Sequence, residues 1–413
     1  MFVYQKGGLP VKIWIDPQEF YSDPELVKQI DDLSRHPFAF NHIALTPDGH
    51  PGRGMPVGGV MAMEGAVCPN AVGVDIACGV MAVKTAYKAS SFTREDLIKI
   101  IQLIKELVPV GSAHQSTNRH KTEANELLDS YLGDCFVKDV EVNPDICIEF
   151  IYGQLGTLGG GNHFGEFQAD EEDNLWIMLH SGSRNLGLKI ANRHAVMAKQ
   201  LCKNYKTPLP NEDLAVLLTD SKEGQAYLND MEFAVAFSYQ NRLTMLADIR
   251  SVLRKYTNKD SFIDTMKDSK DDNSTVFINI HHNFARLENH FGRNLWVHRK
   301  GATCIRPNIV GIIPGSMSTA SYIVRGKDTP ELQQSFFSCS HGAGRVMSRN
   351  KAKETLNMDT FSKSMAHVAS VDVDLAHLDE SEDAYKDIHS VMDNQKDLVE
   401  IIHELKPIMN FKG

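Results

Sequence analysis

Four short apolar segments, far apart in the chain, each come just before a histidine that stands among glycine or polar residues. The segments are GTLGGGNHFGEF, LWIMLHSGSR, VFINIHHNF and SFFSCSHGAGRVMSR, and their histidines are His163, His180, His281 or His282, and His341. The C-terminal ends of buried strands are rigid positions from which a side chain can be aimed, and a neutral imidazole there is a common metal ligand. The repeated pattern predicts strand ends that converge on one site, although each histidine alone is compatible with an ordinary core or surface position.

Asp75 and Cys78 lie three residues apart in VGVDIACGV, a stretch of otherwise small and aliphatic residues. Taken alone, the stretch is typical of a buried cysteine beside a turn-forming aspartate. Together with the histidine segments it supplies a mixed set of Cys, Asp and His ligands that one or two divalent ions can share. A thiolate persists in such surroundings where a metal or another cation lowers its pKa. We therefore expect Asp75 and Cys78 to be metal ligands.

The order of strand-like and helix-like segments predicts an α+β protein. The first 90 residues are rich in Gly and Pro and predict short strands joined by turns, a pattern that returns over residues 145–187. Helical periodicity marks residues 93–109, with Thr93 as the cap, and most of residues 188–204 and 212–256. A polar connector is expected over residues 259–275, strands from VFINI to FFSCS, and a helix near DLVEIIHEL.

Neither strand-rich half looks able to bury its strands alone. We therefore expect residues 1–413 to form one domain, a mixed β-sheet core surrounded by helices, with residues 188–270 as a mostly helical insertion within it.

Composition narrows the class of protein. The 413 residues carry a net charge of −10, seventeen histidines and seven cysteines. The charge argues against a sequence-blind polyanion binder but leaves room for a nucleic-acid end held in a local site. Scattered cysteines in odd number do not fit a disulfide framework, and no apolar run resembles a membrane span or a signal peptide. We expect a cytoplasmic protein.

Two glycine clusters, GGGNH and HGAGR, can turn backbone N–H groups toward phosphate oxygens. Arg184, Arg345 and Arg349 follow two of the histidine segments, and guanidinium groups beside metal ligands suit phosphate recognition. Each feature alone is also compatible with an ordinary turn or a surface salt bridge. The chain lacks a P-loop, a strand-linked G-x-G-x-x-G, an H-E-x-x-H and paired C-x-x-C motifs, and Thr46 stands where a lysine-based nucleotidyl ligase has its lysine.

These motifs, in this order, resemble the RtcB family of GTP-dependent RNA ligases over essentially the whole chain. The matching pieces are HPFAFNHIALTPDGH, VGVDIACGV, GTLGGGNHFGEF, WIMLHSGSR, HHNF, HRKGA, GIIPGSMS, SCSHGAGRVMSR, AYKDI and the terminal KG.

The resemblance implies an RtcB-type fold and two manganese ions. The residues that match the family's metal ligands are Asp75, Cys78, His163, His180 and His282. The cysteine is expected to bridge the ions, and His282 is preferred over His281 because the family's ligand directly precedes the asparagine, here Asn283. Chemistry alone would favour zinc beside a soft thiolate; manganese enters only through the resemblance.

The resemblance also implies that His341 is a guanylated nucleophile. It would attack the α-phosphorus of GTP, and the GMP would pass to an RNA 3′-phosphate, which a 2′,3′-cyclic phosphate yields after hydrolysis. An RNA 5′-hydroxyl would then displace the GMP and join the ends, in tRNA splicing or RNA repair. A histidine suits this role because its unperturbed pKa leaves it neutral near pH 7.

The residues that match the family's guanosine contacts are Asn162, Glu166, Ser316, Ser321, Gly342, Ala343, Gly344, Tyr385 and Lys412. Ordinary surface placement is the alternative for Tyr385 and Lys412. Arg184, Arg345 and Arg349 are the candidates for gripping the RNA terminal phosphate. Gly49 and Asn185 depart from the family's pattern, which leaves open a specialised paralogue that repairs a particular RNA.

Two other functions stay open at this point. A metal-dependent phosphatase or phosphodiesterase acting on RNA ends would need the metal ligands but neither His341 nor Lys412. A non-catalytic RNA-end-binding protein would need none of them intact. The expected partners are GTP and RNA with 3′-phosphate or 2′,3′-cyclic phosphate and 5′-hydroxyl ends, without a membrane; we expect a monomer, with an activating protein as an open alternative.

Overall fold

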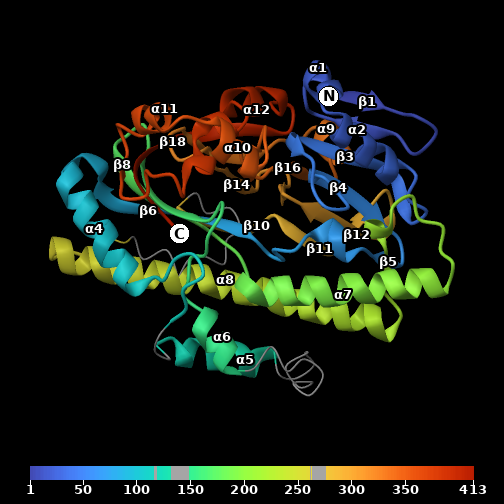
Figure 1. Ribbon diagram of the computed structural model, residues 1–413, viewed down its shortest axis with the longest axis horizontal. Helices are drawn as coiled ribbons and strands as arrows, with labels where there is room; N and C mark the ends of the chain where they lie inside the picture. The colour runs from blue at the N-terminus through green and yellow to red at the C-terminus, as the bar shows by residue number, and fades with distance from the viewer. Residues whose placement is uncertain (116–118, 132–147, 261, 263–275) are drawn as a thin grey trace.

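Two large β-sheets form the centre of this α+β protein, with helices on either side (Figure 1). The computed structural model describes residues 1–115, 119–131, 148–260, 262 and 276–413. In the view of Figure 1, α7 (Arg184–Asn204) and α8 (Lys222–Thr257) run along one side of the sheets, and α10 (Arg349–Thr355), α11 (Met358–Ser364) and α12 (Ile388–Asn394) lie on the other. None of the described helices combines the length and apolar character that crossing a bilayer requires.

The first sheet has six strands in the order β1-β2-β3-β4-β12-β11. In that order they are β1 (Phe2–Tyr4), β2 (Val11–Ile13), β3 (Ala39–His50), β4 (Val57–Met63), β12 (Arg293–Lys300) and β11 (Asn283–His290). All neighbours are antiparallel except β2 and β3, which are parallel. β3 and β12 are both antiparallel to β4, so they end at the same edge of the sheet. Their last residues, His50 and Lys300, line the pocket described below.

The second sheet has eight strands in the order β10-β6-β8-β7-β18-β15-β14, with a short strand beside β18. They are β10 (Phe277–His281), β6 (Gly79–Lys88), β8 (Asn174–Ser181), β7 (Phe164–Ala169), β18 (Val399–Lys412), β15 (Ser321–Gly326), β14 (Val310–Ile313) and β17 (Ala369–Ser370). Two small sheets pair β13 (Ala302–Cys304) with β16 (Ser338–Ser340) and β5 (Ala66–Val67) with β9 (Leu217–Leu218).

The remaining helices are mostly short. They are α1 (Pro17–Ser22), α2 (Pro24–Ser34), α3 (Pro69–Val72), α4 (Arg94–Leu107), α5 (Lys121–Tyr131), α6 (Ile148–Gln154) and α9 (Pro330–Gln334), with single 3₁₀ turns η1 (Ala89–Ser91), η3 (Glu212–Leu214), η4 (Leu378–Glu380) and η5 (Glu382–Ala384). The helix expected after Thr93 is confirmed as α4, and Thr93 and Asp96 form a reciprocal capping box at its start.

The second sheet brings the beginnings and ends of five neighbouring strands to one edge. Because these neighbours are antiparallel, β10, β8 and β18 end at this edge, whereas β6 and β7 begin there. In the register, Val80 pairs with His180, and Phe164 pairs with both His180 and Lys412. The residues at this edge, in order across the sheet, are His282, Cys78, His180, His163 and Lys412.

The expectation that every site histidine follows a strand is wrong for His163. His180 lies near the end of β8, His282 follows β10 and His341 follows β16, but His163 comes just before β7 begins. GTLGGG forms a turn rather than a strand, and Gly159 and Gly161 have positive φ angles that suit glycine. The antiparallel register makes the beginning of one strand equivalent to the end of its neighbour.

Three further segments differ from expectation. Residues 17–34 form α1 and α2, because Asp16 and Asp23 cap helices that each begin with proline, a start signal that outweighs the glycine-rich surroundings. The helix expected near DLVEIIHEL is strand β18, which pairs with β7 and β15; sheet pairing overrides its weak helical pattern. Residues 212–221 hold only η3 and β9 before α8 begins. Most of the polar connector expected over residues 259–275 lies outside the described residues.

Buried Asn241 in α8 ties together the two loops that carry His163 and His180. Its side-chain oxygen accepts from the backbone N–H groups of Gly156 and Thr157, at 2.7 and 3.2 Å. Its amide nitrogen donates to the carbonyl oxygen of Thr157 at 3.0 Å and to Oγ of Ser181 at 3.2 Å. α8 thus fixes the spacing of two site loops through one side chain.

We predict that Asn241→Ala lowers the free energy of unfolding by about 3 kcal/mol, because it leaves two buried backbone N–H groups unsatisfied. Denaturant unfolding measures the change. Asn204→Ala, at the exposed end of α7, is the matched control and should change stability by no more than about 0.5 kcal/mol. Equal effects of the two substitutions would contradict the role given to Asn241.

Candidate active site

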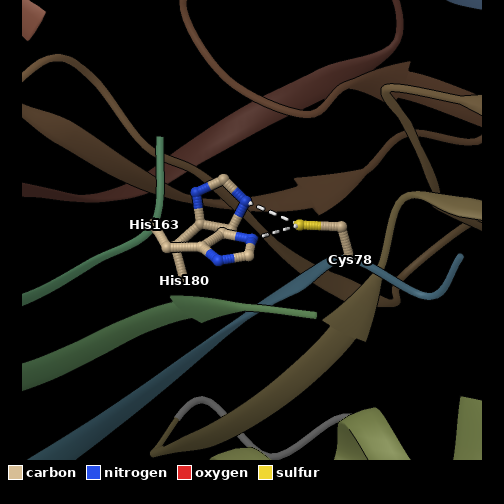
Figure 2. Close-up of side chains that lie close together, drawn as sticks. All are labelled: Cys78, His163 and His180. Carbon is tan, nitrogen blue, oxygen red and sulfur yellow. Dashed lines mark hydrogen bonds between the residues drawn. The ribbon is translucent and has the colours of Figure 1, made fainter. Parts of the chain in front are cut away.

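Cys78 lies between two imidazoles at the edge of the second sheet. Its Sγ is 3.3 Å from Nε2 of His163 and 3.2 Å from Nε2 of His180 (Figure 2). One ligand atom from each of these three buried residues lies within 4.8 Å of the other two. Asp75 joins the group, since its Oδ2 is 3.0 Å from Nε2 of His163. A soft thiolate, imidazoles and a carboxylate in this arrangement could hold a divalent metal ion.

The neutral imidazoles at the cluster can offer lone pairs to a cation. Burial holds the pKa of His180 and of His282 well below the usual value, so both rings are neutral and offer lone pairs. Burial, together with the negative charge of Asp75, raises the pKa of the Cys78 thiol well above its usual value. A metal ion at Sγ would take the place of that proton, so binding would release it.

His282 and His281 have separate environments. The ring of His281 donates through Nδ1 to the carbonyl oxygen of Ala77 at 3.0 Å, on the side of α8. The ring of His282 lines the pocket, and its buried Nδ1 has no hydrogen-bond partner among the described residues. A buried unpaired imidazole nitrogen is costly unless something binds to it. The pocket is thus lined by His282 and not by His281.

The loop that carries Asp75 is held from two sides. Nδ2 of Asn283 donates to the backbone oxygen of Asp75 at 2.9 Å, and Oδ1 of the same amide accepts from the N–H of Gly301 at 2.8 Å. A Cβ at Gly182 would collide with the Asp75 carboxylate. Asn283 therefore fixes the backbone of Asp75, and Gly182 leaves room for its side chain.

His341, which follows β16, is oriented by Asp48, which comes from β3 in the first sheet. Nδ1 of His341 lies 2.6 Å from Oδ2 of Asp48, which also accepts from the His341 backbone N–H at 3.0 Å. Burial opposes ionisation of Asp48, but His341 holds the pKa of this carboxyl below its usual value. The ionised carboxylate accepts a hydrogen bond from Nδ1–H, so Nε2 is the ring nitrogen of His341 that this contact leaves free.

Gly344 permits this contact between β3 and the turn that follows β16. Its φ is +76°, and a Cβ there would collide with the backbone oxygen of Asp48. The HGAGR turn can therefore lie directly on the Asp48 loop only with glycine at this position.

One pocket of about 280 Å³ connects these elements. Its lining includes most of the residues predicted from the sequence: Asp75, Cys78, Asn162, Glu166, His180, His282, Ser316, His341, Gly342, Ala343, Gly344, Arg345, Arg349, Tyr385 and Lys412. The ring of His282 is 4.7 Å from that of His341 and 5.1 Å from that of His180, measured between centroids. The nucleophile candidate and the Cys–His cluster thus share one cavity.

Glu380 holds together four of the predicted residues. Its carboxylate lies 2.6 Å from Nζ of Lys412, 2.5 Å from Arg349 and 3.4 Å from Arg345, and it accepts from the hydroxyl of Tyr385 at 2.9 Å. Burial opposes ionisation, but Lys412 and the arginines keep the pKa of Glu380 below its usual value. Arg345 and Arg349 thus form salt bridges, which the sequence left open as the alternative to phosphate binding, and both also line the pocket. Surface placement is wrong for Lys412, which is 1% exposed.

Glu166 is a buried acid on the same side of the pocket. It accepts from Nδ2 of Asn410 at 2.6 Å and from Nε2 of Gln168 at 2.7 Å. Burial raises its pKa to about 7 despite these hydrogen bonds. The side-chain oxygens of Asn410 and Gln168 have no partners among the residues described, so either amide can turn over to accept from a protonated Glu166.

Three predicted residues lie behind the pocket rather than on its lining. His163 contacts the cluster through Cys78 and Asp75. Arg184 donates to Oγ1 of Thr157 at 3.1 Å and lies 3.3 Å from Nδ1 of His163, so it supports that ring. Oγ of Ser321 accepts from Gln168 at 3.0 Å, one step removed from Glu166.

Sequence reasoning missed the positioning acids Asp48 and Glu380 and the pocket residues His50, Lys300 and Asn283. Asp48 and His50 stand in the quoted HPFAFNHIALTPDGH motif, and Lys300 stands in HRKGA, so these motifs could have drawn attention to them. Glu380 has no local signal, because its partners come from distant segments.

We predict that Cys78→Ala abolishes divalent-ion binding while keeping the fold, at a cost of about 1 kcal/mol for a small buried side chain. Metal content after dialysis and thermal unfolding measure the two effects. Cys202→Ala removes another buried thiol, one that accepts from the backbone of Val216, and should bind metal like the wild type. Wild-type metal affinity in Cys78→Ala would rule out the metal site.

We predict a pH-dependent gain in stability for Glu166→Gln. The folded pKa of about 7 lies above the ordinary 4.5, so the unfolded chain releases this proton first as pH rises. The contribution of protonated Glu166 to the free energy of unfolding is fully present below about pH 4.5 and is lost as pH rises through about 7. The melting temperature of the wild type should therefore fall relative to Glu166→Gln between pH 5 and pH 8, while the exposed control Glu354→Gln shows a constant difference. A pH-independent difference for Glu166→Gln would contradict the raised pKa.

Comparison with known proteins identifies the family to which the chain belongs. Residues 29–413 match the family model described as tRNA-splicing ligase RtcB. RNA-splicing ligase RtcB of Escherichia coli (strain K12) is 38% identical over 98% of this chain and 97% of its own length. The tRNA-splicing ligase RtcB of Aeropyrum pernix is 30% identical over 89% of this chain and 87% of its own length. The tRNA-splicing ligase RtcB of Thermococcus kodakarensis is 28% identical over 98% of this chain and 95% of its own length. The resemblance drawn from the motifs is confirmed: the chain belongs to the RtcB family of RNA ligases.

Proposed function

We propose that this protein is a GTP- and Mn²⁺-dependent RNA ligase that joins an RNA 3′-phosphate or 2′,3′-cyclic phosphate end to a 5′-hydroxyl end through a histidine–GMP intermediate. The observation that carries the proposal is the pairing of Nδ1 of His341 with the Asp48 carboxylate at 2.6 Å, in the pocket that contains the Cys78 cluster. This pairing engages Nδ1 and leaves Nε2 of His341 free to act as the nucleophile, beside groups suited to hold metal ions.

Two ions are proposed to be held by Asp75, Cys78, His163, His180 and His282, with Cys78 shared. The unpaired Nδ1 of His282 and the close approach of Cys78, His163 and His180 fit such a centre. When bound, divalent ions neutralise phosphate charge and orient the attacking and leaving groups.

The chain's own residues divide the chemistry. Nε2 of His341 bonds to the α-phosphorus of GTP, and the bond from that phosphorus to pyrophosphate breaks. Asp48 retains its hydrogen bond and stabilises the positive charge that forms on the ring, as a carboxylate does for a histidine general base. The RNA 3′-phosphate then takes the GMP from His341, and the 5′-hydroxyl oxygen bonds to the RNA phosphorus and expels GMP.

The guanosine is proposed to lie against Glu166, Ser316, Tyr385 and Lys412, which line the pocket together with Asn162. An acceptor such as Glu166 can pair with the N–H groups of guanine, which adenine does not offer in the same places. Arg345 and Arg349 line the pocket as well and are proposed to contact phosphate oxygens of the RNA end. The names of the relatives suggest tRNA splicing as the process, with repair of broken RNA as the alternative.

We predict that purified protein incubated with Mn²⁺ and GTP labelled at the α-phosphate becomes covalently labelled, and that the label is acid-labile as a phosphoramidate should be. His341→Ala should show no label and no joining of RNA ends. Denaturing electrophoresis of both proteins, side by side, measures this. His389→Ala, an exposed histidine on α12, is the matched control and should be labelled like the wild type.

The alternative functions give different results. A phosphatase or phosphodiesterase would keep its hydrolytic activity in His341→Ala, and a binding protein would be indifferent to the substitution. Absence of label from folded, metal-loaded wild type would contradict the histidine–GMP mechanism.

A further inference from the structure

A second histidine of the pocket, His50, shares the anchor of His341. It is the last residue of β3, two residues after Asp48, and it lines the same pocket. Its Nδ1 lies 2.9 Å from the backbone oxygen of Asp48, whereas Nδ1 of His341 lies 2.6 Å from the Asp48 carboxylate. Both imidazoles are therefore held by Asp48, His50 through the backbone oxygen and His341 through the carboxylate.

The hydrogen bond of His50 determines its tautomer. A backbone carbonyl can only accept, so Nδ1 of His50 must carry the hydrogen. Burial lowers the pKa of the ring to about 4, and the nearby His341 and Lys386 add to this effect, so the ring is neutral at physiological pH. Nε2 then has a lone pair and no hydrogen. It has no hydrogen-bond partner among the residues the structure describes, and it is not sealed from solvent.

The pocket lining combines charged donors with carboxylate acceptors, among them Asp75, Glu166 and Glu380. Lys300, Arg345, Arg349 and Lys412 supply donors and positive charge to this lining, as binding of phosphates requires. A neutral imidazole lone pair cannot bind a phosphate oxygen that carries no proton. Its natural partner is a hydroxyl group of the substrate.

His50 lies at the wall of the pocket that adjoins the ring of His341. His50 pairs with Val57 across β3 and β4, and a Cβ at Gly301 would collide with Val57 and lie 3.1 Å from the His341 ring. This wall is made of His50, Val57 and Gly301. It adjoins the nucleophile directly, so a group held by His50 is beside the reacting phosphates.

We propose that Nε2 of His50 accepts a hydrogen bond from the RNA 5′-hydroxyl, holds that oxygen beside the activated 3′-end, and selects a 5′-hydroxyl over a 5′-phosphate. The inference rests on the proposed ligase function. A terminal 5′-phosphate would bring charged oxygens without a hydrogen to the lone pair, and the two acceptors would repel each other. The hydroxyl donates its hydrogen to Nε2, which directs an oxygen lone pair toward the phosphorus.

The test separates the joining step from guanylylation. The probes are an RNA whose 3′-phosphate already carries GMP and a short RNA with a 5′-hydroxyl, used with Mn²⁺-loaded full-length protein. His50→Asn keeps a donor near the position of Nδ1, for the Asp48 carbonyl, and removes the acceptor at Nε2. We expect it to slow joining by roughly tenfold to 100-fold, the range for one lost hydrogen bond to the substrate, and to slow labelling by GTP far less.

Two more variants sharpen the result. His50→Gln places an amide oxygen near the position of Nε2 and should recover part of the joining rate. His403→Asn, a histidine of β18 outside the pocket lining, should join at the wild-type rate. A competing RNA with a 5′-phosphate should inhibit joining by His50→Asn more strongly than joining by the wild type.

Several outcomes would overturn the assignment. Equal loss of labelling and joining in His50→Asn would mean that the ring acts through Asp48 on His341. An increased KM for GTP with normal joining would place the contact on the nucleotide, and unchanged joining would remove His50 from the reaction. A wild-type protein that neither labels nor joins would instead overturn the proposed function, and this inference with it.

Discussion

The antiparallel register of β10, β6, β8, β7 and β18 is the constraint on which the site depends. It places three strand ends and two strand beginnings at one edge, so that residues far apart in sequence become neighbours. A slip of one residue in any of these strands would turn its side chains to the opposite face of the sheet. The buried helix α8 fixes the same edge from one side, because Asn241 bonds to both the loop before His163 and the end of β8.

Charge at the site is arranged by two acids that take part in no predicted metal binding. Asp48 in β3 sets the tautomers of His341 and His50, whereas Glu380 neutralises Lys412, Arg345 and Arg349. Asp48 thus orients the two imidazoles, and Glu380 holds the three cationic side chains in place. Among the described residues, the buried Nδ1 of His282 is one of the side-chain atoms left without a hydrogen-bond partner, and a metal ion can bind to it.

Local sequence signals predicted the parts of the structure that local interactions determine. Thr93 and the apolar periodicity after it defined α4, and the ordered motifs defined the family and the residues that line the pocket. The same reasoning failed where distant pairing decides: DLVEIIHEL became a strand because it pairs with β15, and His163 reached the site from the beginning of a strand. Asp48 lies 293 positions from His341, and nothing in either segment alone indicates that they meet.

Anomalous diffraction from a crystal loaded with Mn²⁺, recorded at the manganese absorption edge, tests the central claim most directly. The account predicts a peak bonded to Sγ of Cys78 and to the facing nitrogens of His163 and His180, with a second peak beside it that includes His282 among its ligands. A fully loaded crystal in which the thiol of Cys78 still contacts both imidazoles and manganese lies elsewhere would contradict the metal centre, and with it the chemistry proposed for His341.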